Sequence, residues 1–342
     1  MKGLYWKIKA DEPKKMLAFL ETLNEYNIKG ILLMNTSKEL KVGTAVGDIT
    51  PPIGIAMAGD LDPRERLAEG TLLPLQVKVM VIEIAGQHLV YALFDLIHLE
   101  HLTVAKALEQ ITAETGISAD RIVWTCSHTH SGPVTRRWLK QYTAWKLTDL
   151  VWLEHTMDTF VDCVKRANAS KVPALPFFSR GLIQGIMSNR RYCYKDGSQQ
   201  NNWLAPPQNV QCVGAAAPVD PEVGILSFTT KAGGETVLLY DFACHANTTW
   251  GKQWHSDYPG LVSELLSAEL GPDTFSIFMP GACGDINPDG TNTEVAKRLT
   301  SVILYAIEDH RNAILLPELG ARREIVTLPL RKFNDETKAR VK

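Results

Sequence analysis

The chain has 342 residues, of which 45% are hydrophobic and 22% are charged, a composition typical of a globular protein with a sizeable buried core. Its 36 basic and 38 acidic residues leave a net charge of -2. This balance argues against a nucleic-acid partner, because nucleic-acid binders usually carry a basic surplus.

The amino terminus, MKGLYWKIKADEPKKM, lacks the apolar core of a secretory signal. No apolar run approaches the roughly 20 residues of a membrane span. We therefore expect no transmembrane segment and a cytoplasmic location, or a secreted one if the amino terminus is incomplete. The six cysteines are widely spaced and include no CxxC pair, which argues against a disulfide framework and against a four-cysteine zinc site.

In the first half of the chain, apolar spacing predicts three helices, over residues 12–26, 102–116 and 148–168. Strands are predicted near the start of the Gly- and Pro-rich segment 41–59 and over 77–84, 88–96 and 121–126. The two middle strands are separated by a short turn, so we expect them to form a hairpin.

The second half begins with a polar segment, 185–221, that predicts an irregular loop; long loops of this kind are often functional or disordered. A second hairpin is predicted next, followed by alternating helices and strands, over 223–228, 235–243, 258–270, 274–280, 293–312 and about 324–330. Because helices and hairpin-forming strands mix throughout, we predict a layered α/β domain with a mixed β-sheet.

Three of the predicted strands end in clusters of polar residues. Residues 121–126 lead into SHTHSGP, 235–243 into Cys-His-Ala-Asn-Thr, and 274–280 into GACGDINP. Ligand sites of α/β sheets gather beyond the carboxyl ends of strands. The convergence of histidine, aspartate and asparagine at these ends predicts a functional site.

His128 and His130 are two residues apart, a spacing that places both side chains on one face of an extended backbone. His245 follows another strand. Imidazole nitrogens suit zinc, and a catalytic zinc takes about three protein ligands and leaves one position for water. The sequence therefore predicts a zinc site, with carboxylate candidates at three positions, Glu222, Asp257 and Asp285.

Two alternatives to metal binding are open. The histidines of the cluster can instead serve only to hydrogen-bond loop backbone. A serine hydrolase is the other alternative, because Ser127, Ser131 and Ser256 lie near histidines in the sequence, although no G-x-S-x-G motif is present.

An ordered set of motifs resembles the neutral/alkaline, non-lysosomal ceramidases and their shorter bacterial relatives. The motifs are VGTAVGDITPP, SHTHSGP, SNRR, VDPEVGILSF, DFACHANT, SDYPG and GACGDINPD, and they occur in the family's order between about residues 40 and 330. The resemblance implies a ceramidase-like domain over 41–342, with residues 1–40 as an N-terminal extension.

The resemblance also implies a role for each matching residue. His128 and His245 would bind zinc, and His130 would face the substrate and orient its carbonyl. Arg190 would hold an oxygen of the reacting group, and Asp285 would lie beside the metal centre.

The chain departs from the family at two points. Asn287 stands where the family has an active-site serine, and an amide can orient a substrate but cannot act as a nucleophile. The glutamate and tyrosine that complete the family's zinc site have no match before Lys342. We therefore expect either that the domain lacks its C-terminal part or that its ligand set is filled differently.

The leading hypothesis from the sequence is a zinc-dependent hydrolase that cleaves the C–N bond of an N-acyl substrate, either a small molecule or a lipid. An esterase or deacetylase acting on a small ester or sugar is the second hypothesis. An inactive binding protein of the same fold is the third. The sequence does not predict the oligomeric state.

Overall fold

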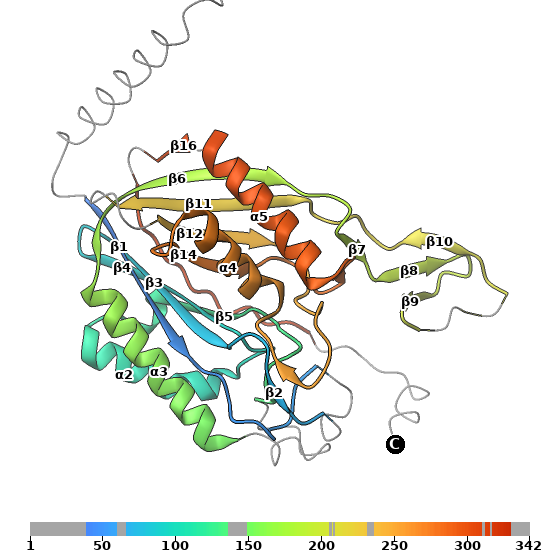
Figure 1. The fold of residues 1–342 in the computed structure, drawn as a ribbon, viewed down its shortest axis with the longest axis horizontal. Coiled ribbons are helices and arrows are strands. Elements are labelled where there is room, and N and C mark those ends of the chain that lie inside the picture. The colour runs from blue at the N-terminus through green and yellow to red at the C-terminus, as the bar shows by residue number, and fades with distance from the viewer. Residues whose placement is uncertain are drawn as a thin grey trace, which may run out of the picture.

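A computed structural model describes residues 39–59, 66–135, 149–204, 207, 209–230, 236–309, 312–314 and 317–329 (Figure 1). The helix expected over 12–26 and most of the N-terminal extension lie outside these residues. None of the helices in the described part of the chain has the length and apolarity that a membrane span requires.

The main sheet has the strand order β14-β12-β11-β6-β1-β3-β4-β5, with β16 paired to β6. The pairs β4·β5 and β12·β14 are parallel and the others are antiparallel, so the predicted mixed sheet is confirmed. Its strands are β1 (Leu40–Asp48), β3 (Gln76–Ile84), β4 (Gln87–Phe94), β5 (Ile122–Cys126), β6 (Val172–Leu182), β11 (Glu222–Thr230), β12 (Thr236–Phe242), β14 (Phe275–Pro280) and β16 (Asn312–Ala313).

This sheet folds over on itself at the junction of β1 and β6. Only two residue pairs join these strands, Lys41 with Pro173 and Val42 with Val172. Strand β14, at one end of the strand order, contacts β3, β4 and β5 from the other end. The sheet therefore consists of a first half-sheet (β1, β3, β4, β5) and a second half-sheet (β6, β11, β12, β14), which pack face to face.

Side-chain alternation in β3 explains the layers. Met80 and Ile82 are buried between the half-sheets, whereas Val79 and Val81 are buried on the other face, in one cluster with α2 (His101–Thr115) and α3 (Leu150–Ala169). Successive side chains of a strand point to opposite faces, so an apolar run such as that of β3 is buried on both.

The second half-sheet is covered by the other two described helices, α4 (Asp257–Leu270) and α5 (Asn292–Asp309), as Figure 1 shows. The resulting helix–sheet–sheet–helix order confirms the predicted layered α/β class. Local signals set the helix ends: the Asp149 side chain accepts the N–H of Trp152 at 2.9 Å before α3, and Gly116 ends α2 with a φ of 74°.

The side chains of Lys78 and Tyr91 donate three hydrogen bonds from the first half-sheet to the second half-sheet and its helix α4. The buried Lys78 ammonium of β3 donates to the Ser263 hydroxyl at 2.6 Å and to the Ser276 carbonyl at 3.1 Å. The Tyr91 hydroxyl of β4 donates to the carbonyl of Phe278 in β14 at 3.1 Å. These bonds satisfy buried polar groups and fix how the half-sheets lie against each other.

The segment 185–221 is not the irregular loop that its composition predicts. It contains β7 (Met187–Asn189), β8 (Arg191–Tyr194), β9 (Gln199–Asn201) and β10 (Cys212–Ala215). Strands β8, β9 and β10 form a small sheet that projects from the sandwich at the right of Figure 1, and β7 pairs with β15 (Ile286–Pro288).

Two further differences concern strands. The sequence analysis missed β6, and the strand expected near 324–330 is wrong, because the described residues 324–329 form no strand pairing. The remaining short elements are β2 (Gly70–Thr71), β13 (Gln253–Trp254), which pairs with β2, and the 3-10 helix η3 (Ala119–Arg121).

We predict that Tyr91→Phe destabilises the fold by about 1 kcal/mol, because the Phe278 carbonyl loses its hydrogen bond inside the interface. The melting temperature is expected to fall by about 2 °C, measured by circular dichroism. Tyr192→Phe, in the projecting sheet, is the control and should melt like the wild type. Equal melting temperatures of Tyr91→Phe and the wild type would contradict a stabilising role for the hydrogen bond between Tyr91 and Phe278.

The buried Asp95 is expected to make the stability of the fold depend on pH. Burial raises its pKa to about 6 from an ordinary 3.8, although Lys78 and the Gln76 N–H, 3.0 Å away, oppose the rise. Between these two values the folded chain holds a proton that the unfolded chain has lost. The contribution of Asp95 to stability is therefore present below about pH 4 and is lost as the pH rises to about 6.

Asp95→Asn removes this titration and keeps an acceptor oxygen for Gln76. Urea unfolding of both proteins between pH 4 and 7 should show that the wild type loses stability relative to the variant as the pH rises through this range. A stability difference that is constant with pH would contradict the prediction.

Candidate metal centre

The loops that follow β5, β12 and β14 meet at one edge of the sandwich. Each half-sheet ends in a parallel pair at this edge, so the carboxyl ends of β5, β12 and β14 come together. Backbone hydrogen bonds connect the loops: His130 N–H donates to the Ala246 carbonyl at 3.2 Å, and His245 N–H donates to the Ile286 carbonyl at 3.1 Å. The predicted convergence of the three strand ends is therefore seen in the structure.

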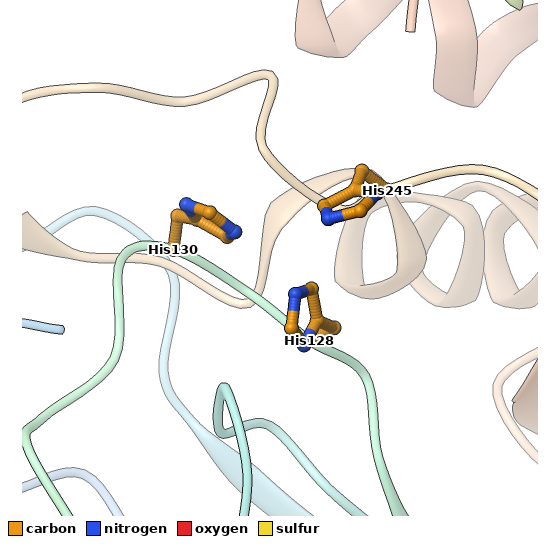
Figure 2. A group of neighbouring side chains, drawn as sticks. All are labelled: His128, His130 and His245. Atoms are coloured by element: carbon orange, nitrogen blue, oxygen red, sulfur yellow. The ribbon is translucent and has the colours of Figure 1, made fainter. Parts of the chain in front are cut away.

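The side chains of His128, His130 and His245 form a cluster, shown in Figure 2. One ligand nitrogen from each ring lies within 4.8 Å of the other two. The ring centroids are separated by 5.2 Å for His128 and His130, 4.8 Å for His128 and His245, and 5.8 Å for His130 and His245. This histidine cluster joins the HxH pair to a residue more than 100 positions away.

Backbone carbonyls fix the tautomers of two of the rings. His128 Nδ1 lies 2.8 Å from the Ile97 carbonyl, and His245 Nδ1 lies 2.6 Å from the Cys283 carbonyl and 3.1 Å from that of Ile286. A carbonyl only accepts, so each Nδ1 carries the proton and each Nε2 keeps a lone pair. Metal-binding histidines are commonly oriented by this kind of bond.

His130 differs from the other two histidines in its hydrogen bonding. Both of its ring nitrogens are buried and have no hydrogen-bond partner among the described residues. Burial, helped by His128, His245, Arg66 and Arg190, lowers its pKa to about 3. Burial likewise lowers the pKa of His245 to about 4. Neutral imidazoles with lone pairs that face one another suit a cation that replaces the missing hydrogen bonds.

The cluster fits a metal ion with a small contraction. Zinc–nitrogen bonds of 2.0–2.1 Å place tetrahedral ligands about 3.4 Å apart, so ligand nitrogens as far apart as 4.8 Å have to approach each other by about 1.4 Å. No carboxylate joins the three histidines in the part of the chain that the structure describes. The donor set fits the nitrogen ligands of zinc, and the identity of the ion is part of our proposal below.

None of the three carboxylate candidates joins the three histidines as a possible ligand in the described part of the chain. Glu222 pairs with Arg180 at 3.5 Å on the strand surface. Asp257 is fully buried, and its carboxylate accepts bonds from the backbone or hydroxyl groups of Thr248, Thr249 and Tyr258. Asp285 accepts from the Asn189 side chain at 2.9 Å, and its backbone carbonyl accepts the N–H of Arg190 at 2.7 Å.

Arg190 reaches the cluster from the segment between β7 and β8. Its Nη1 atom lies 3.4 Å from His245 Nε2 and 3.4 Å from the Asn287 side-chain oxygen, and its Nη2 donates to the Gly284 carbonyl at 2.7 Å. The pairing of β7 with β15 brings these segments together. The structure thus places Arg190 next to His245 and Asn287, and Asp285 bonds to the Arg190 backbone. The roles that the resemblance implies for these three residues stay predictions.

Two of the four described non-glycine residues with a positive φ lie in or next to the loops of the site. His128 has a φ of 65° and Asp257 a φ of 58°, in the left-handed region that few residues other than glycine adopt. The hydrogen bonds of His128 Nδ1 and of the Asp257 carboxylate hold these conformations. Residues held in such conformations tend to cluster at functional sites.

Sequence reasoning missed three residues at the site. Arg66 is 8% exposed and donates to the carbonyls of His130 at 2.9 Å and Gly251 at 2.6 Å. The Trp250 ring lies 5.9 Å from the His130 ring, and the Trp203 ring lies 5.1 Å from the Arg190 guanidinium carbon. All three occur in irregular segments, and none belongs to a motif that would mark it.

The structure does not support the alternative hypothesis of a serine hydrolase. The Ser131 hydroxyl donates to the Thr249 carbonyl at 2.9 Å rather than to a histidine. Ser127 and Ser256 are buried. None of the three is placed as a nucleophile beside a histidine base, an arrangement that a serine hydrolase needs.

Comparisons with known proteins confirm the expected fold. No family model and no curated protein matches the chain. Neutral ceramidase from Pseudomonas aeruginosa has a similar structure, with a TM-score of 0.66 and 20% identity over 80% of this chain and 45% of that one. A ceramidase complexed with C2 gives a TM-score of 0.65 and 20% identity over 80% of this chain and 44% of that one.

The ceramidase-like fold expected from the motifs is therefore shown, at an identity too low to carry over an activity. The chain spans less than half the length of either ceramidase chain. Activity, metal and substrate are matters of proposal.

We predict about one zinc per chain by elemental analysis after reconstitution, and loss of that zinc in the His128→Ala, His245→Ala double variant, because two of the three nitrogen ligands are removed. His155→Ala, on the exposed face of α3, is the matched control and should keep the metal. Zinc retained by the double variant would place the metal elsewhere in the chain.

Proposed function

We propose that this chain forms the metal-binding core of a zinc-dependent hydrolase that cleaves the amide bond of an N-acyl compound. The observation that carries the proposal is the histidine cluster, in which one ring nitrogen of each histidine lies within 4.8 Å of the others, beside Arg190 on a ceramidase-like fold. His128 and His245 would hold the ion, with His130 facing the substrate or serving as a third ligand. A bound zinc supplies Lewis acidity and a means of activating water at neutral pH.

Arg190 would bind the carbonyl oxygen of the substrate. Its guanidinium faces His245 and is oriented by Asn287 and by the Gly284 carbonyl. Negative charge grows on the carbonyl oxygen when the amide carbon becomes tetrahedral, and a preoriented cation stabilises it. Asp285 would steady this arrangement through its backbone bond to Arg190 and its side-chain bond to Asn189.

Water would be the nucleophile. Asn287 has no group that can attack a carbonyl, and the nearby Ser131 hydroxyl is bonded to backbone. Addition of water to the carbonyl carbon and cleavage of the C–N bond give a carboxylic acid and an amine. The low pKa of His130 keeps its imidazole neutral at pH 7, which suits orienting a substrate or binding a metal better than acting as a general base.

The substrate would be a small-molecule or lipid N-acyl compound. The name ceramidase, borne by both similar structures, motivates testing N-acyl lipids. Esters present the same carbonyl to Arg190, so an esterase or deacetylase activity is the alternative to test in parallel. An inactive binding protein of the same fold is the third hypothesis, motivated by Asn287, which stands where the family has a serine.

A substrate panel separates these three hypotheses. We expect the zinc-loaded chain to release amine from N-acyl amides, to lose activity with a chelator and to regain it with zinc. Faster hydrolysis of matched esters or acetylated sugars would favour the esterase alternative. Zinc binding without any turnover would favour the binding protein.

We predict that Arg190→Met lowers kcat on the best amide by about 100- to 1,000-fold, with a smaller change in KM, because the lost cation acts mainly as charge develops. Arg191→Met is the matched control, since Arg191 is the exposed neighbour on β8. A wild-type kcat in Arg190→Met would remove Arg190 from the mechanism.

A further inference from the structure

Two tryptophans near the histidine cluster are exposed to solvent. Trp203 is 57% exposed and follows β9 in the projecting sheet, and Trp250 is 59% exposed in the loop between β12 and β13. They come from segments far apart in the sequence. Large apolar rings exposed beside a polar site are candidates for ligand contact.

Each tryptophan contacts a group that in turn contacts the cluster. The Trp203 ring lies 5.1 Å from the guanidinium carbon of Arg190, which lies 3.4 Å, through Nη1, from His245. The Trp250 ring lies 5.9 Å from the ring of His130, at an interplanar angle of 70°. The cluster is thus connected at one end to Trp203 and at the other to Trp250.

Neighbouring hydrogen bonds hold both rings in place. The N–H of Asn202, next to Trp203, donates to the Arg190 carbonyl at 2.7 Å. Arg66 donates to the carbonyls of Gly251 and His130, and its guanidinium carbon lies 5.4 Å from the Trp250 ring. Each ring therefore lies beside a guanidinium, while more than half of each tryptophan residue stays exposed.

An exposed tryptophan distinguishes planar from non-planar apolar groups. Aromatic pairs gain about 0.5–1.5 kcal/mol beyond the area that they bury, and a saturated ring of similar size gains only the area. We propose that Trp203 and Trp250 are specificity-determining residues that select substrates with a planar aromatic ring on the acyl or the amine side of the scissile bond. This inference rests on the proposed function for the reaction, but its binding test does not.

The binding test compares phenylacetate with cyclohexylacetate. Both carry the same carboxylate for Arg190 and for a bound zinc, and their rings are similar in size but differ in planarity. Isothermal titration of the chain, once with and once without added zinc, should give phenylacetate a Kd about two- to tenfold lower in both cases. Trp203→Leu or Trp250→Leu should remove most of this preference.

Two controls guard against misfolding and general loss of aromatic surface. Trp203→Phe and Trp250→Phe keep a ring and should keep most of the preference. Phe178→Leu removes an aromatic side chain that also lies beside a guanidinium, that of Arg180 at 5.2 Å, but on β6. This control should leave the preference unchanged.

The kinetic test uses pairs of amides that differ only in the same ring. N-phenylacetyl and N-cyclohexylacetyl amides of one amine probe the acyl side, and N-acetyl derivatives of benzylamine and cyclohexylmethylamine probe the amine side. A higher kcat/KM for the aromatic member of at least one pair, lost in a leucine variant, is the expected result.

The outcomes separate the two proposals. Binding that prefers phenylacetate without turnover of any amide would overturn the proposed reaction and leave the role of the tryptophans standing. Turnover of the amides, with equal Kd values for phenylacetate and cyclohexylacetate and equal kcat/KM values within each amide pair, would overturn the role of the tryptophans. It would leave the proposed reaction standing. A preference that survives both leucine substitutions would also overturn it.

Discussion

The packing of one half-sheet against the other is the constraint on which the site depends. Each half-sheet has a parallel pair, β4·β5 or β12·β14, and parallel strands end at the same edge. Face-to-face packing brings these two edges together, so a histidine pair from one half-sheet meets a histidine from the other. Lys78 and Tyr91 tie the interface at strands β3 and β4, and a shift there would separate His128 from His245.

The polar loops are set by backbone as much as by side chains. His130 and His245 each donate a backbone N–H to another of the three loops, and the carbonyls of Ile97, Cys283 and Ile286 face the imidazoles. Carbonyls carry no sequence information, because every residue has one. This is why the HxH spacing and the strand ends predict the histidine cluster, whereas the tautomers and the route of Arg190 into it need the structure.

Other parts of the fold escaped prediction for physical reasons that can be named. β6 contains Pro173 and Pro176, and proline within a run argues against a paired strand; here both prolines are accommodated in ladders with β1 and β11. Residues 324–329 have a strand-like composition but no partner strand, and a strand needs one. Strands β7 to β10 are only three or four residues long, too short to show a hydrophobic pattern of their own.

Two features of the cluster lower the stability of the folded chain. His128 is held at a positive φ, and both ring nitrogens of His130 are buried without a hydrogen-bond partner among the described residues. Strain of this kind costs on the order of 1–3 kcal/mol, and a buried unsatisfied polar group costs about as much. An ion that binds the imidazoles would offset the cost of the unpaired His130 nitrogens. The strained backbone of His128 would then serve to orient its ring toward that ion. Such an ion would bind the folded chain in preference to the unfolded one, so it would stabilise the fold through the imidazoles that are costly to bury.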